Sequence, residues 1–183
     1  MSRKVSFIIA FILLALIQLY VPAQMVWEHE SVLKEGKSFK FRTAPIDPND
    51  PFRGKYVQLS YNNGLISVEG NEWEAGAKVF VLIEEDSAGF ARVRRVSKTR
   101  PTDYSYYFES NINFINQDNE VSIDYPFDRF YMEESQAPQA EEVYEESVRD
   151  FNQVAYASVT IKDGVAVLTD VFINDQSVRD LVD

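Results

Sequence analysis

An apolar segment near the amino terminus constrains this chain more than any other feature. From Val5 to Trp27 no residue carries a formal charge, and two basic residues, Arg3 and Lys4, precede the segment. As a helix, it would extend roughly 34 Å, which is enough to cross the hydrocarbon layer of a bilayer with some tilt. Because basic flanks stay cytoplasmic, we expect residues 1–27 to form a transmembrane signal-anchor helix and the rest of the chain to lie outside the cytoplasm.

The same segment also has features of a cleaved signal peptide. Its most apolar part, from Phe7 to Ile17, has the length of a secretory core, and Val21-Pro22-Ala23 would allow cleavage after Ala23. Apolar residues resume beyond that point and continue to Trp27. This continuation favours the retained anchor over the cleaved peptide.

Composition excludes several classes of functional site. The 183 residues include no Cys and a single His, His29, so a disulfide, a thiolate nucleophile and a multi-His metal site within one chain are all excluded. The formal net charge of −11 argues against a broad surface for nucleic acid. We therefore expect no cofactor, no metal ion and no nucleic-acid partner. Ten Tyr and thirteen Phe suit a β-rich core, where aromatic side chains pack on pleated faces.

Beyond the apolar segment the sequence predicts a β-rich body. Residues 28–36 are polar and end at Gly36, so we expect a juxtamembrane continuation of the helix that stops at this glycine. Alternating side chains from Lys37 to Thr43 and from Lys55 to Tyr61 predict two strands. The expected fold class is mainly β (α+β). Residues 37–183 would form one extracytoplasmic domain, β-barrel-like or a sandwich, with an accessory amphipathic helix.

Two hairpins are predicted within this domain. The apolar run Lys78 to Glu84 is expected to turn and return as Phe90 to Val96. The second hairpin would join residues 154–162 to residues 165–173 across Asp163-Gly164, a strong two-residue turn signal. Two further segments also read as extended, residues 104–108 and 120–131.

One helix is predicted in the second half of the chain, with Pro138 at its first position. Apolar and small residues recur at helical spacing on one face, namely Ala140, Val143, Tyr144, Ser147 and Phe151. The other face carries Glu141, Glu142, Glu145 and Glu146, and Glu145 is placed to pair with Arg149. We interpret the acidic face as a solvated surface, with an acidic docking face as the alternative.

A stretch rich in proline and aspartate precedes the second predicted strand. Proline restricts its own φ and the residue before it, so residues 45–51 predict a rigid turn that Asp47 and Asp50 can cap. Tyr56 and Tyr61 differ by five positions, so on a regular strand one should face the core and the other the surface or a cleft. Leu59 shares the face of Tyr61 and is most simply a core residue.

These residues resemble the signature of the GDYXXLXY protein family. Gly54, Tyr56, Leu59 and Tyr61 fall on the pattern, whereas Lys55 replaces the aspartate of the family name. The later segment from Asp128 to Glu134 is similar to a second family element, an aromatic pair followed by a variable residue and Glu. The order of anchor, turn rich in proline and aspartate, signature strand, hairpin, helix and hairpin also agrees with the family over nearly the whole chain. The resemblance implies a membrane-anchored extracytoplasmic protein without an assigned activity, encoded beside a polytopic membrane protein.

We therefore expect a single-pass protein of the cell (inner) membrane that acts as a binding or assembly partner of a polytopic membrane protein, rather than an enzyme. The alternative is an envelope hydrolase or a Ca²⁺-binding structural domain that uses carboxylates of the motif segments. A Ser–Lys protease with Ser31 or Ser38 and Lys78 is a weaker alternative. The candidate binding residues are Asp47, Asp50, Arg53, Gly54, Tyr56, Leu59, Tyr61, Arg129, Tyr131, Glu133 and Glu134.

Overall fold

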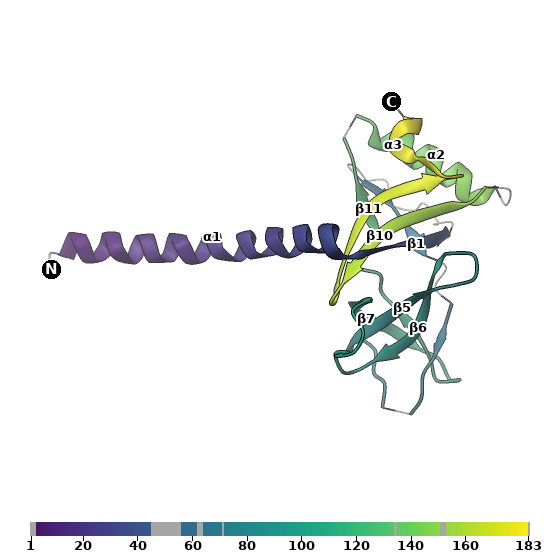
Figure 1. Cartoon of the computed structure of the whole chain (residues 1–183), viewed down its shortest axis with the longest axis horizontal. Helices are drawn as coiled ribbons and strands as arrows, with labels where there is room; N and C mark the ends of the chain where they lie inside the picture. The colour runs from purple at the N-terminus through teal and green to yellow at the C-terminus, as the bar shows by residue number, and fades with distance from the viewer. Residues whose placement is uncertain are drawn as a thin grey trace.

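The structure, a computed structural model, describes residues 3–44, 56–61, 64–70, 72–133, 135–150 and 153–182. A long helix, α1 (Arg3–Glu35), projects from a β-rich body (Figure 1). Its segment Phe7–Glu35 is long and apolar enough to cross a membrane, and its apolar part is not buried in the body. The helix ends before Gly36, as predicted.

The described residues of the body form two five-stranded sheets and one ribbon of two strands. The first sheet has the order β12-β11-β10-β1-β3 and contains β1 (Lys37–Ala44), β3 (Ser60–Tyr61), β10 (Ala155–Lys162), β11 (Val165–Ile173) and β12 (Gln176–Ser177). The second has the order β4-β8-β7-β5-β6 and contains β4 (Ile66–Ser67), β5 (Lys78–Glu85), β6 (Ala91–Ser97), β7 (Tyr107–Ile115) and β8 (Glu120–Ile123). The ribbon pairs β2 (Tyr56–Gln58) with β9 (Arg129–Tyr131).

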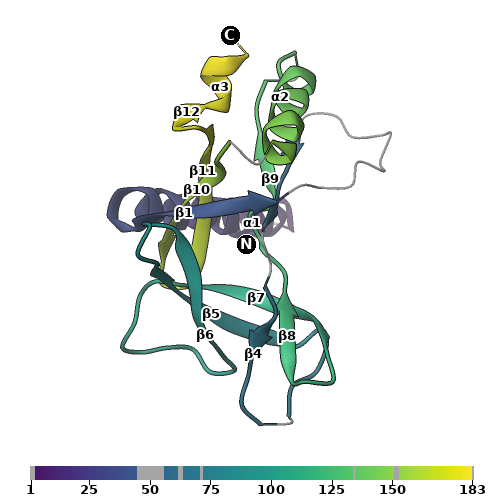
Figure 2. The ribbon, with the colours of Figure 1, turned by 90° about the vertical axis from the view of Figure 1, so that its right-hand side faces the viewer.

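The two sheets are joined at two places, so that together they approach a closed barrel. On one side Lys40 of β1 forms a parallel bridge with Phe90, just before β6. On the other side Phe108 of β7 forms a parallel bridge with Gly164, in the turn between β10 and β11. Figure 2 shows the sheets one above the other, with α1 seen nearly end-on. The expected mainly β (α+β) class with a barrel-like domain is confirmed.

Both predicted hairpins form. Strands β5 and β6 pair antiparallel, and so do β10 and β11. In the second turn Asp163 has φ 50° and Gly164 has φ 102°. Positive φ at both central residues gives the turn the twist of the flanking strands, which explains why Asp-Gly signals a hairpin here.

Two segments predicted as continuous strands are interrupted. In residues 56–61, β2 pairs with β9, and the hydrogen bond of 2.8 Å from the Leu59 amide to the Asp128 carbonyl continues this pairing. Beyond Leu59 the chain changes partner, because β3 pairs with β1. In residues 120–131, β8 ends at Ile123 and the chain turns around Pro126, which has no N–H to offer a ladder. The strand predicted over residues 104–108 lies further along the chain, because β7 starts at Tyr107 and continues to Ile115.

Helix α2 (Ala137–Arg149) carries Pro138 in its first turn, and α3 (Val178–Leu181) follows β12. Ala140, Tyr144 and Ser147 are buried as predicted. Glu145 pairs with Arg149 at 3.0 Å. The predicted face residue Phe151 lies outside the described residues.

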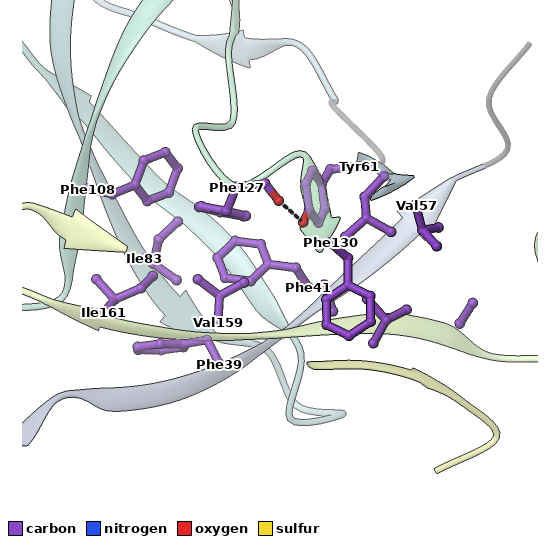
Figure 3. Close-up of a cluster of buried hydrophobic side chains, with 14 of the residues drawn as sticks. Phe39, Phe41, Val57, Tyr61, Ile83, Phe108, Phe127, Phe130, Val159 and Ile161 are labelled. Atoms are coloured by element: carbon purple, nitrogen blue, oxygen red, sulfur yellow. Dashed lines mark hydrogen bonds between the residues drawn. The ribbon is translucent and has the colours of Figure 1, made fainter. Parts of the chain in front are cut away.

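Aromatic side chains fill the space between the two sheets (Figure 3). Phe127 is the common neighbour in this cluster: its ring centroid lies 5.0 Å from that of Phe41, 5.2 Å from that of Phe108 and 5.2 Å from that of Tyr61. Phe41 belongs to the first sheet and Phe108 to the second, so this cluster holds the sheets together.

Candidate functional site

The two motif segments, more than 70 residues apart in the chain, pair directly in the ribbon of β2 and β9. Tyr56 stands opposite Tyr131, and their ring centroids are 5.6 Å apart. The Arg129 guanidinium lies 5.3 Å from the centroid of the Tyr56 ring. Its hydrogen bond to Tyr131, followed by the charge of Asp128, raises the pKa of Arg129, so the group stays cationic. We call Tyr56, Arg129 and Tyr131 the ribbon surface.

The ribbon surface faces outward while the other side of the same strands faces the core. The Tyr131 side chain is 62% exposed, whereas Val57 and Phe130 are buried. The guanidinium of Arg179, from α3, lies 4.9 Å from the ring of Phe130, and α2 packs against β2. An exposed aromatic and cationic surface on a supported ribbon is suited to binding a protein partner, because Tyr and Arg dominate the energetics of interfaces.

The other signature residues serve the core. Leu59 and Tyr61 are buried, as the alternation predicted, and Tyr56 is only half-buried. The Tyr61 hydroxyl donates a hydrogen bond of 2.7 Å to the Phe127 carbonyl (Figure 3). Burial raises the pKa of Tyr61 far above its ordinary value, so the hydroxyl keeps its proton and its donor role. Tyr61 therefore positions the turn that leads into β9.

We expect Tyr61→Phe to lower the free energy of unfolding by about 1–2 kcal/mol, because the buried Phe127 carbonyl loses its donor. A matched control exists in Tyr125, a half-buried tyrosine of the same aromatic cluster whose ring centroid lies 4.9 Å from that of Tyr61 and whose hydroxyl has no hydrogen bond among the described residues. Tyr125→Phe should change stability by less than about 0.5 kcal/mol, since it removes no such bond. Urea unfolding followed by tyrosine fluorescence measures both; equal losses for the two variants would contradict this role of Tyr61.

The polar site predicted from the motif carboxylates consists largely of residues outside the described part of the chain. Asp47, Asp50, Arg53, Gly54 and Glu134 all lie there, as does Lys55. Glu133 is exposed, and its backbone carbonyl accepts from the amides of Gln136 and Ala137 at 3.0 Å each. Among the described residues no group of three His, Asp or Glu side chains is arranged to hold a metal ion.

The arrangement expected for a Ser–Lys protease does not occur. The Lys78 side chain is 61% exposed and pairs with Glu109 at 2.5 Å, so it is not a buried base. Ser38 shares a hydrogen bond with Ser158 on the neighbouring strand. Lys162 does reach Ser31, at 3.4 Å, but its hydrogen bond to Glu35 raises the pKa of Lys162. A lysine held protonated cannot activate a serine.

Sequence reasoning missed a second polar site at the base of α1. A cavity of about 500 Å³ lies between this helix and the β10–β11 turn, and Arg100 and Lys162 contribute to its lining. Neither residue belongs to a motif: Lys162 binds Glu35 of α1 from the end of β10, and Arg100 binds the Asp163 carbonyl in the β10–β11 turn. No local pattern signals such a site, because its parts come from segments far apart in the chain.

Comparison with known proteins places the chain in a family without supplying an activity. No curated protein matches it, and no solved structure matches it. The family model described as "GDYXXLXY protein" matches residues 18–171 and thus covers both motif segments of the ribbon. This chain belongs to the GDYXXLXY protein family.

Proposed function

We propose that this protein is a single-span protein of the cell (inner) membrane, with its β-rich domain outside the cytoplasm, and that the domain binds a polytopic membrane protein through the ribbon surface. The apolar α1 supports the anchor, since its side chains would be solvated unfavourably in water. Arg3 and Lys4, ahead of the apolar residues, support the orientation.

The junction between helix and body supports a domain held at a defined position above the bilayer. Val32 of α1 is only 3% exposed, so the last turns of the helix pack on the body. Lys162 of β10 binds both Glu35 and Ser31 of α1. With no flexible linker between helix and body, the ribbon surface would meet a neighbouring membrane protein in one orientation.

The ribbon surface is the single observation that carries the partner role. Its exposed Tyr131 and Arg129 and its half-buried Tyr56 place aromatic rings and a cation together in the motif segments. Aromatic and arginine side chains are enriched at the centres of protein interfaces.

Site-specific photocrosslinking in intact membranes tests this role. A photoreactive phenylalanine analogue at Tyr131 should form one discrete adduct, identified by mass spectrometry as an integral membrane protein. The same analogue at Phe114, which is 52% exposed on β7 and lies outside the ribbon, serves as the matched control. Adding Arg129→Ala should reduce the Tyr131 adduct about tenfold, as expected for the loss of one interface hot spot. The same adducts from both positions, or none from Tyr131, would refute the partner role.

A further inference from the structure

The cavity at the base of α1 is polar and charged. Trp27 and Glu28 line it from the helix, while Arg100, Lys162 and Asp163 line it from the body. Figure 1 shows the β10–β11 turn at the edge of the body from which α1 projects. The cavity thus opens beside the point where the helix leaves the domain.

The position of the cavity relative to a bilayer follows from the length of α1 between the membrane and the body. It rests on the membrane anchor proposed above. If the span ends at Trp27, the helix rises roughly 7 Å between Trp27 and Val32, where the body begins to cover it. The headgroup layer on each side of a bilayer is about 5–8 Å thick. The turn residues Asp163 and Gly164, which share the cavity with Trp27, therefore lie at the level of the lipid headgroups.

Arg100 is held in place by neutral groups. Its Nε donates to the Tyr107 hydroxyl at 2.7 Å and its Nη2 donates to the Asp163 carbonyl at 2.9 Å. Among the described residues no carboxylate forms an ion pair with this guanidinium, although the charges of Glu109 and Asp163 add to the rise in the pKa of Arg100 that its hydrogen bond to Tyr107 causes. Lys162 differs, because Glu35 and Ser31 already occupy its ammonium. Arg100 is thus an oriented cation with charge and N–H donors to offer an anion, and a guanidinium suits the geometry of phosphate.

The carboxylates of Glu28, Glu109 and Asp163 border the same cavity, and that of Glu109 is already paired with Lys78 at 2.5 Å. Glu28 lies on the helix side and accepts one hydrogen bond, from Gln24 at 3.0 Å. Asp163 lies exposed on the turn side. Their charge disfavours a ligand that is only anionic, whereas their oxygens can accept N–H bonds from an ammonium group.

We propose that this cavity binds the headgroup of a zwitterionic phospholipid with a primary ammonium group. Arg100 contacts the phosphate, and Glu28 and Asp163 accept hydrogen bonds from the ammonium. A choline headgroup has no N–H to donate, and a glycerol headgroup leaves both carboxylates facing a net negative ligand.

Native mass spectrometry of the full chain in mild detergent tests this assignment. Three synthetic phospholipids with identical acyl chains and ethanolamine, choline or glycerol headgroups are added in turn. The wild-type chain should retain the ethanolamine lipid about tenfold better than either other lipid, and Arg100→Gln should lower that retention about tenfold, as the loss of one charge-assisted hydrogen bond implies. Arg95→Gln, at an exposed arginine of β6 outside the cavity lining, should leave it unchanged.

A second variant separates the lipid site from the fold. Glu28 lies on the helix, and among the described residues its side chain hydrogen-bonds to Gln24 alone. Glu28→Gln should therefore bring ethanolamine and choline retention close together without changing domain stability. Equal retention of the three lipids by the wild type, or the same loss in the Arg100 and Arg95 variants, would overturn the assignment. Alkaline extraction of membranes distinguishes failure of the anchor from failure of the lipid site. A chain that is released refutes both the anchor and the lipid site. A chain that stays in the membrane but retains the three lipids equally refutes the lipid site alone.

Discussion

Gly36→Ala should weaken the attachment of α1 to the body and lower the free energy of unfolding by about 3 kcal/mol, the upper range for overpacking a rigid site. A Cβ at this position would lie 2.5 Å from the Val32 carbonyl oxygen, 2.7 Å from Thr160 Cγ2 and 3.1 Å from the Ile161 carbonyl oxygen. Two of these three neighbours are backbone atoms, so they move only if the helix end and β10 separate.

Gly64→Ala is the matched control for this variant. Apart from its chain neighbours, a Cβ at Gly64 meets no atom of the described residues within 4 Å, so this substitution should change stability by less than about 1 kcal/mol in either direction. Urea titration of both full-length variants in the same detergent, followed by circular dichroism, makes the comparison. Equal midpoints would show that the junction between helix and body is not tightly packed.

Phe108→Ala should cost about 4 kcal/mol, the usual range for deleting a fully buried aromatic ring. Phe108 is 0% exposed, and its ring centroid lies 5.6 Å from that of Tyr125 and 5.2 Å from that of Phe127. It also belongs to the bridge between β7 and the β10–β11 turn, so the cavity would open where the two sheets meet.

Phe114→Ala provides the control on the same strand. Its side chain is 52% exposed, so the loss should stay below about 1 kcal/mol. The difference between the two variants, measured by urea unfolding, reports the contribution of the aromatic cluster rather than of β7 itself. A loss at position 114 as large as at position 108 would contradict a core located between the sheets.

Tyr56 and Tyr61 show how much of the burial of side chains a local sequence pattern can predict. Their separation of five residues predicted one ring in the core and the other at the surface or in a cleft, and the structure buries Tyr61 and leaves Tyr56 half-buried. The pattern did not indicate that the strand between them breaks at Leu59. Up to Leu59, whose amide donates to the Asp128 carbonyl, this segment pairs with the distant β9, and beyond Leu59 it pairs with β1 instead. Side-chain alternation specifies which face is buried but carries no information about the partner strand.

The sequence by itself determined the elements whose signals are local. The long apolar helix, the two hairpins and the amphipathic helix each depend on residues within a few positions of one another, so hydrophobic period and turn chemistry were sufficient to predict them. Tertiary structure alone decided the ribbon of Tyr56 and Tyr131, the close contact at Gly36 and the cavity beside Arg100. Each of these joins segments that are distant in the chain, and such contacts form only when the whole body packs.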